Sequence, residues 1–249
     1  MQNFDLHIHS TYSDGKDSLE DIVLAAIGMG LSKIGFSDHS YTPFDESYCI
    51  SIEDIPRYID EISVLKEKYK DKITILSGIE QDFFSTENTD KFDYVIGSVH
   101  YIKVDDGFVP VDETKEILLK ASEQYFQGDI YKLIDSYYDT VADVVDKTNA
   151  DIIGHIDLIT KFNENGCLFD ENNQRYKAAY KKACDKLIST NKLFEINTGA
   201  ISRGYKKSPY PSSDIYEYLK SKGAKFILSS DSHSTDTICY NFDKYSNLV

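Results

Sequence analysis

The sequence predicts an α/β protein whose core is a parallel β-barrel, within one domain that spans residues 1–249. Short apolar segments have the length and composition of buried strands, and segments with helical periodicity separate most of them. Strands joined through helices pair in parallel, and this number of strands favours a closed or nearly closed barrel over the alternative, an open doubly wound sheet. The predicted strands are 4–9, 33–37, 73–79, 94–99, 151–155, 193–197 and 226–230.

The helices between these strands place an apolar residue every three or four positions and have recognisable ends. In the first, Asp17 or Ser18 can cap a helix that continues to about Met29, where Gly30 is the stop signal. The helix at 130–147 has the most regular apolar spacing of the set. The predicted helices are 17–29, 55–69, 113–126, 130–147, 172–190 and 212–222.

Other segments fall outside this alternation. Residues 41–52 form a long loop that is rich in Tyr, Pro, Asp and Ser. The segments 101–104 and 108–111 flank the Asp-Asp-Gly sequence at 105–107, which predicts a hairpin that extends past the strand end as a flap. The polar tail at 235–249 gives a weak signal for a last short helix.

Composition and charge narrow the class of partner. The formal charge of −15 disfavours a partner bound through its phosphate backbone, so we expect no nucleic-acid partner. The four cysteines are scattered without a CxxC pair, which argues against a thiolate zinc site. No apolar run approaches the ~18 residues that span a bilayer, and the first residues lack the features of a signal peptide. We therefore expect a cytoplasmic protein without a membrane partner, and its oligomeric state stays open.

All six histidines lie at or just past the C-terminal end of a predicted strand, and carboxylates lie at the same level. A single histidine there is more often solvated or hydrogen-bonded than a ligand. The carboxyl ends of parallel strands meet at one face of a barrel, however, so the whole set indicates a cluster. Its members are His7, His9, His39, His100, His155 and His233, with Asp14, Asp38, Glu80, Asp82, Asp157 and Asp231.

The residue types of this cluster are those that bind divalent metal ions. Imidazole nitrogens combined with carboxylate oxygens suit zinc, manganese or ferrous iron. The set exceeds what one tetrahedral ion uses, so we expect two or three divalent ions. Such a centre can hold a phosphoryl group and activate water, which predicts a metal-dependent hydrolase acting on a small phosphorylated metabolite.

Several motifs, in one order, give the chain a specific resemblance. They are HIHSTYSDG from His7, FSDHS from Phe36, SGIEQDF from Ser77, GSVHY from Gly97, GHIDLI from Gly154 and LSSDSH from Leu228. With these motifs the chain resembles the PHP (polymerase and histidinol phosphatase) superfamily over residues 5–233. The resemblance implies a distorted seven-stranded, TIM-barrel-like (β/α)7 barrel with the metal site at the C-terminal ends of the strands.

The resemblance also implies how the ligands are shared. One ion would be held by His7, His9, Glu80 and Asp231, a second by Glu80, His100 and His155, and a third by Asp14, His39 and His233. A hydroxide bridging metal ions would attack phosphorus in line, while the ions stabilise the charge on the phosphoryl oxygens. Glu80, Asp231 and His233 are the expected catalytic residues, and the group that protonates the leaving alkoxide stays open.

Within the family, the later motifs are most similar to the branch that hydrolyses L-histidinol phosphate in histidine biosynthesis. A small phosphomonoester also needs cationic contacts, for which Arg203, after the sixth strand, is the candidate. Lys161 can supply a point charge, because Thr160 stands where these phosphatases usually carry arginine. Asn197 would face inward with Glu195, and either residue would contact the substrate or orient the loop of Arg203.

Other functions fit part of the sequence. A PHP phosphoesterase acting on nucleotides or nucleic-acid ends would share the first motif, although the chain lacks a basic, aromatic-rich stretch. A PHP-type protein-tyrosine phosphatase would need a peptide-binding insertion, and none is obvious. A non-catalytic metal-binding or regulatory barrel is a further alternative, which the complete ligand set disfavours.

Overall fold

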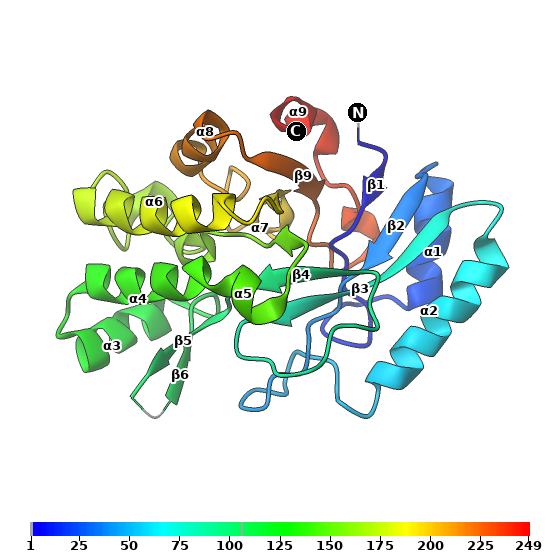
Figure 1. Ribbon diagram of the computed structural model, residues 1–249, viewed down its shortest axis with the longest axis horizontal. Coiled ribbons are helices and arrows are strands. Elements are labelled where there is room, and N and C mark those ends of the chain that lie inside the picture. The colour runs from blue at the N-terminus through cyan, green and yellow to red at the C-terminus, as the bar shows by residue number, and fades with distance from the viewer. Residues whose placement is uncertain (1, 106) are drawn as a thin grey trace.

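The computed structural model describes residues 2–105 and 107–249, and its core is a parallel sheet curved into a barrel (Figure 1). Within these residues the sheet has seven strands in the order β1-β2-β3-β4-β7-β8-β9. The strands are β1 (Phe4–Asp5), β2 (Lys33–Phe36), β3 (Thr74–Asp82), β4 (Tyr94–Ser98), β7 (Ile152–Ile153), β8 (Leu193–Asn197) and β9 (Lys225–Ser229). This order and pairing confirm the predicted (β/α)7 barrel.

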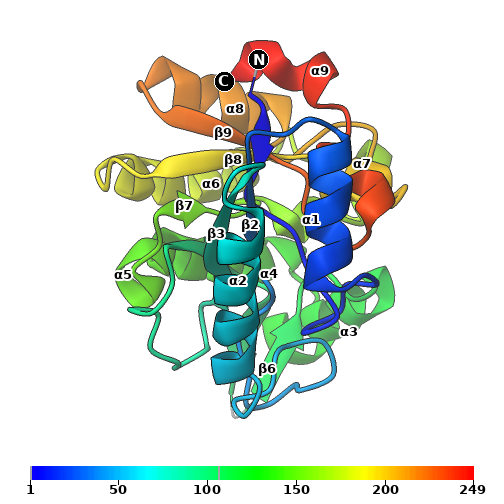
Figure 2. The ribbon, with the colours of Figure 1, turned by 90° about the vertical axis from the view of Figure 1, so that its right-hand side faces the viewer.

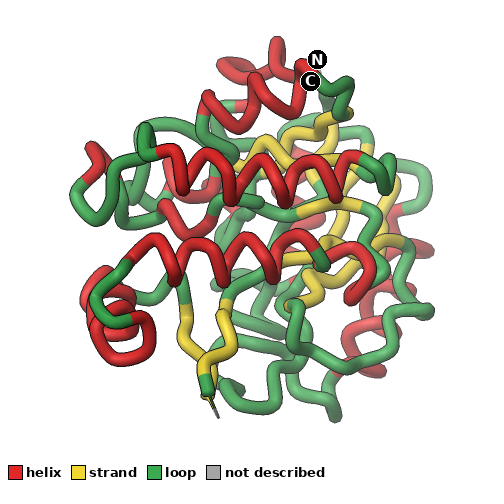
Figure 3. Tube along the Cα trace, turned by 60° about the vertical axis from the view of Figure 1, so that its left-hand side comes forward, coloured by secondary structure: helices red, strands yellow, loops and turns green. Residues whose placement is uncertain are grey.

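Helices cover the outside of the barrel in two groups. In Figures 1 and 2, α1 and α2 lie side by side on one flank, and Figure 3 shows α4 and α6 running alongside each other on the other. No helix in the described part of the chain is long and apolar enough to cross a membrane. The helices are α1 (Leu19–Gly28), α2 (Ile55–Tyr69), α3 (Lys115–Phe126), α4 (Ile130–Ala142), α5 (Val144–Thr148), α6 (Gln174–Ile188), α7 (Gly199–Ser202), α8 (Ser213–Ser221) and α9 (Phe242–Tyr245). Short 3-10 turns are η1 (Leu158–Thr160), η2 (Glu164–Gly166), η3 (Thr235–Thr237) and η4 (Ser246–Leu248).

Side chains help to close the barrel between its first and last strands. Near the site, Ile8 and Ser232 form a parallel bridge. At the other end, the side-chain amide of Gln2 donates to the carbonyl of Leu228 at 2.7 Å and accepts from its N–H at 3.0 Å. The first strand, β1, is therefore shorter than the predicted strand 4–9, because side-chain hydrogen bonds and one isolated bridge replace a continuous backbone ladder.

The departures from the prediction include a divided helix, an additional short helix and a hairpin whose turn is only partly described. The helix expected at 130–147 is divided at Asp143, whose non-helical φ of −101° and ψ of 0° separate α4 from α5. The one-turn helix α7 was not predicted, because four residues are too few to show a helical period. The hairpin forms from β5 (Tyr101–Val104) and β6 (Gly107–Pro110), while its predicted turn residue Asp106 lies outside the described residues.

Tyr94 fills the interior of the barrel beneath the site. Its hydroxyl lies 2.6 Å from the carbonyl oxygen of Leu6 and 2.9 Å from that of Phe36, so it links two neighbouring strands. Glycines on β2 and β3 leave the space for its ring, since a Cβ on Gly35 or Gly78 would overlap it. The barrel therefore depends on absent side chains at these two positions.

We expect Gly78→Ala to destabilise the fold by about 1–3 kcal/mol, because the added methyl group overlaps the Tyr94 ring and lies 2.7 Å from the Phe36 carbonyl oxygen. Gly28→Ala is the matched control: its Cβ meets no atom within 4 Å, and helix propensity predicts a gain of up to ~1 kcal/mol. Urea unfolding measures both free energies. Equal stability of the two variants would contradict the packing argument.

Candidate metal centre

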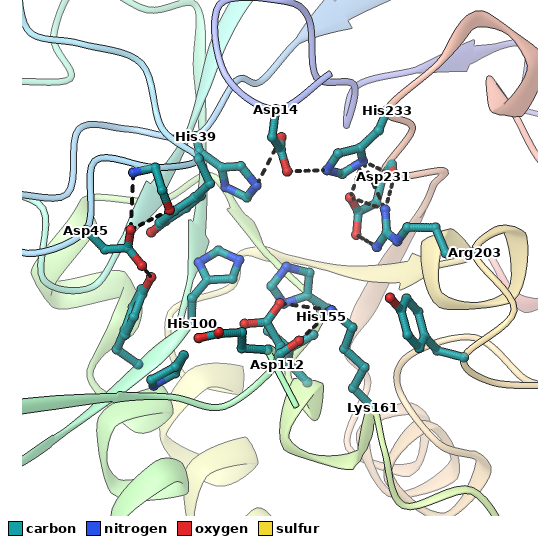
Figure 4. A pocket seen from close by; sticks show the side chains of 17 residues that line it. Asp14, His39, Asp45, His100, Asp112, His155, Lys161, Arg203, Asp231 and His233 are labelled. Carbon is teal, nitrogen blue, oxygen red and sulfur yellow. Dashed lines mark hydrogen bonds and ion pairs between the residues drawn. The ribbon is translucent and has the colours of Figure 1, made fainter. Parts of the chain in front are cut away.

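The nine residues predicted as metal ligands meet at the carboxyl ends of the strands, around a cavity of about 430 Å³ (Figure 4). His7, His9 and Glu80 are buried directly beneath it. The other six line it: Asp14, His39, His100, His155, Asp231 and His233. The barrel thus gathers side chains that are as many as 226 positions apart, a difference of 233 and 7, in one place.

Glu80 occupies the centre of this arrangement. Its Oε2 lies 2.8 Å from Nδ1 of His39 and 3.4 Å from Nε2 of His7. Its Oε1 lies 2.9 Å from Nε2 of His155 and 3.5 Å from Nε2 of His100. Because each oxygen faces a different group of imidazoles, the carboxylate has the geometry required to bridge two ions.

A second group of potential ligands surrounds Asp14 at the cavity mouth. Its carboxylate lies 3.1 Å from Nε2 of His233 and 3.7 Å from both Nε2 of His39 and Nδ1 of His9. In Figure 4, Asp14 lies between His39 and His233. Four donor atoms within 4.8 Å of one another can hold an ion here, and His9 joins the Asp14, His39 and His233 set that the resemblance implied.

Asp38 holds the loop that presents Asp14. Its carboxylate accepts hydrogen bonds from the backbone N–H of Ser10 at 2.8 Å and from the hydroxyl of Ser13 at 2.6 Å. The loop then turns at Gly15, where a Cβ would overlap the backbone of His9. Asp38 is therefore a structural member of the predicted carboxylate set and does not line the cavity.

The chemistry of the donor set fits divalent metal ions. Buried Nε2 of His7 and both ring nitrogens of His9 have no hydrogen-bond partner among the described residues. Polar atoms without partners are costly to bury, and a metal ion satisfies them. Burial, reinforced by the charges of His233 and His39, lowers the pKa of His9 to about 3. His9 is therefore neutral near pH 7, which is the form that ligates a metal.

Two further carboxylates orient the histidines from behind. Oε1 of Glu195 lies 2.6 Å from Nδ1 of His7, and Oδ2 of Asp82 lies 3.2 Å from Nδ1 of His100. Such contacts fix which ring nitrogen carries the proton and leave Nε2 free for a metal. The sequence predicted that Glu195 faces inward and either contacts the substrate or orients the loop of Arg203; its contact with His7 was not predicted.

The two predicted cationic contacts line the cavity, and each is held by a carboxylate (Figure 4). Nη2 of Arg203 donates to Oδ2 of Asp231 at 2.9 Å, and Nη1 donates to its carbonyl oxygen at 2.7 Å. Nζ of Lys161 donates to Oδ2 of Asp112 at 3.1 Å and to its carbonyl oxygen at 2.7 Å. Burial raises the pKa of Asp231, but Arg203 and His7 outweigh it and hold that pKa well below its ordinary value.

Asn197 lies behind the cavity wall. Its side-chain amide donates to Glu195 at 3.2 Å and to Asp231 at 3.3 Å, and its oxygen accepts from the N–H of Gly199 at 2.9 Å. Gly199 begins the short helix that leads to Arg203. Of the two roles considered for Asn197, the structure favours orientation of this loop.

Residues that the sequence did not identify complete the cavity. Oδ2 of Asp45 accepts a hydrogen bond from the Tyr101 hydroxyl at 2.8 Å, and the ring of Phe44 stacks on that of Phe108 at 3.7 Å. The loop at 41–52 is thereby docked on the β5–β6 hairpin. The missed lining residues are Asp45, Ser47, Tyr48, Tyr101, Pro110, Asp112, Glu113, Leu158 and Tyr205.

A parallel barrel with clustered imidazoles and carboxylates at its strand ends defines a metal-binding α/β barrel. The family model described as PHP domain matches residues 5–199, and the chain belongs to the PHP family. It is 29% identical over 268 residues to a probable histidinol-phosphatase of Schizosaccharomyces pombe, covering 95% of this chain and 82% of that protein. It is 30% identical over 266 residues to the histidinol-phosphatase of Lactococcus lactis, covering 100% of this chain and 91% of the relative.

A solved structure shows the same architecture. The crystal structure of histidinol phosphate phosphatase from Lactococcus lactis, complexed with zinc, L-histidinol and phosphate, superposes with a TM-score of 0.74 at 26% identity. The match covers 99% of this chain and 92% of that one. The resemblance that the motifs indicated is therefore confirmed for the family and the fold.

We expect Glu80→Ala to lower the number of metal ions bound per chain, because it removes the carboxylate between the two groups of histidines. Elemental analysis of the purified protein measures this number. Glu20→Ala, which removes an exposed carboxylate paired with Lys68, is the control and should leave it unchanged. An unaltered metal content in Glu80→Ala would contradict the bridging position.

We expect Glu195→Gln to weaken metal binding by roughly 10- to 100-fold, the usual effect of losing the partner of a ligating histidine. The amide lacks the charge that faces Nδ1 of His7 at 2.6 Å. Titration of the metal-loaded protein with a chelator measures the affinity. Wild-type affinity in this variant would show that Glu195 does not orient His7 for metal binding.

Proposed function

We propose that the protein is a metal-dependent phosphomonoesterase that hydrolyses L-histidinol phosphate to L-histidinol and phosphate. The observation that carries this proposal is the cluster centred on Glu80, which lies beneath a cavity with cationic groups on its wall. The relatives named histidinol-phosphatase, matched over nearly the whole chain, support the substrate. The L-histidinol and phosphate present in the Lactococcus lactis crystal structure support it further.

Glu80 and the eight other predicted ligands would hold two or three zinc, manganese or iron ions. When bound, these ions supply the activation of water and the neutralisation of charge on the phosphoryl oxygens. The protein's own contribution is to keep the imidazoles oriented, through Glu195 and Asp82, in a buried pocket. Arg203 offers a planar guanidinium suited to two phosphate oxygens, and Lys161 offers a point charge.

The size and lining of the cavity support a small substrate. About 430 Å³ is within the range of small-molecule sites and is far too little for a folded nucleic acid. Tyr48 and Tyr101 give one wall aromatic surface, and the carboxylates of Asp45 and Asp112 suit a substrate that carries an amine and an imidazole. A biosynthetic phosphatase of this kind would act in the cytoplasm on a soluble metabolite.

The experiment that tests this function is a comparison of substrates. Purified protein loaded with zinc or manganese is assayed on histidinol phosphate, nucleoside monophosphates, nucleoside bisphosphates, short oligonucleotides and p-nitrophenyl phosphate. We expect the highest kcat/KM for histidinol phosphate. Turnover of histidinol phosphate no faster than that of p-nitrophenyl phosphate would reject the proposed substrate, and preference for a nucleotide would support the alternative phosphoesterase.

We expect Arg203→Ala to raise KM for histidinol phosphate by roughly tenfold or more, because a charge-assisted contact to the phosphoryl group is lost. Its metal content should change far less. Arg175→Ala is the matched control, since Arg175 pairs with Asp129 and Asp135 on the surface. Steady-state kinetics with elemental analysis measures both effects. Loss of metal without a rise in KM would mean that Arg203 serves Asp231 and not the substrate.

A further inference from the structure

Lys206 is a buried lysine to which none of the roles above applies. The residue is only 8% exposed, and its Nζ donates to Oγ1 of Thr160 at 2.7 Å. The ring of Tyr210 lies 5.2 Å from Nζ. Within residues 2–105 and 107–249, Thr160 is the one hydrogen-bond partner of the Lys206 Nζ. Removing an ammonium from water costs several kcal/mol, so a buried lysine with few partners needs a compensating role.

The hydrogen bond between Lys206 and Thr160 joins the segment that follows β8 to the segment that follows β7. Lys206 follows α7 and Arg203, and its backbone N–H donates to the carbonyl of Ala200 at 3.2 Å. Thr160 ends the turn η1, immediately before Lys161. The segment carrying Arg203 is thereby fastened to the turn carrying Lys161, and both of these cations line the cavity.

A second contact between the same segments lies at the cavity surface. The ring of Tyr205 lies 4.8 Å from Nζ of Lys161 and 5.7 Å from the ring of Phe162, at an interplanar angle of 89°. Tyr205 lines the cavity and is exposed, whereas Lys206 lies beneath it and is buried. The exposed contact alone is weak, whereas the hydrogen bond between Lys206 and Thr160 is buried.

The buried carboxylate of Asp157 explains why residue 206 is a cation. Asp157 is fully buried, and its Oδ2 accepts from the N–H of Ser212 at 2.8 Å while its Oδ1 has no hydrogen-bond partner among the described residues. Lys206 is the cation that interacts electrostatically with this carboxylate. A neutral side chain at position 206 would remove both the hydrogen bond to Thr160 and the positive charge that interacts with Asp157.

We infer that Lys206 is a positioning residue that sets the separation of Arg203 and Lys161, and thereby the affinity of the site for a phosphoryl group. It touches neither the cavity nor the predicted metal ligands. The inference rests on the proposed phosphatase function, because it assumes that Arg203 and Lys161 contact phosphate. It differs from a purely structural role in predicting a selective effect on phosphate binding.

The test uses Lys206→Met, Thr160→Val and the double variant in the metal-loaded protein. Inorganic phosphate is the probe, its affinity measured by calorimetry and by product inhibition. We expect Lys206→Met to weaken phosphate binding by about tenfold, equivalent to about 1.4 kcal/mol, with a smaller change in kcat and unchanged metal content. The double variant should bind phosphate no more weakly than Lys206→Met, because both substitutions remove the same bond.

Lys207→Met is the control, since it removes the same charge from the exposed neighbouring residue on the same loop and should leave phosphate affinity unchanged. Equal phosphate affinities in Lys206→Met and Lys207→Met, or additive effects in the double variant, would overturn the inference. If Lys206→Met does not fold, Thr160→Val alone decides: weaker phosphate binding supports the role and unchanged binding rejects it. Failure to hydrolyse histidinol phosphate would reject the proposed substrate, whereas phosphate titration would still test Lys206.

Discussion

The burial of one carboxylate among five imidazoles is the constraint on which the site depends. Glu80 faces His7, His39, His100 and His155 at 2.8–3.5 Å, with His9 slightly farther, at 3.7 Å. Burial raises the pKa of Glu80, but the charges of His39, His7 and His100 outweigh it and hold the pKa well below its ordinary value. An ionised carboxylate in a buried site is stable only with cationic partners, so Glu80 depends on the histidines either as charged groups or as neutral ligands of the metal ions.

The barrel brings Glu80 and the histidines close enough to interact. Parallel strands bring their carboxyl ends to one face, and Tyr94 supports that face from below by bonding to the backbones of two strands. Asp82, two residues beyond Glu80, then orients the imidazole of His100 from behind. The alternation of side chains along a strand thus puts a metal ligand and the partner of another ligand on the same strand.

The sequence predicts the barrel and the members of the cluster well, because both follow from local patterns. Apolar runs identify the strands, and the histidines and acids at or just past the ends of six of the seven runs must lie at one face. It does not predict which loop residues reach the cavity: Asp45 and Tyr101 meet across 56 positions through contacts that no periodicity encodes. The division of the predicted helix at Asp143 and the roles of Glu195 and Lys206 likewise arise from tertiary packing.

The overall charge of −15 does not conflict with an anionic substrate. Exposed charges farther away than the Debye length of about 8 Å at physiological ionic strength are largely screened, so the groups within the cavity dominate. There, Arg203 and Lys161 are already paired with Asp231 and Asp112, so their own positive charge is partly cancelled. Attraction of a phosphate ester therefore has to come chiefly from the ions that the histidine cluster holds. On the proposed function, the paired cations would contribute orientation more than attraction, so the separation between them would affect phosphate binding.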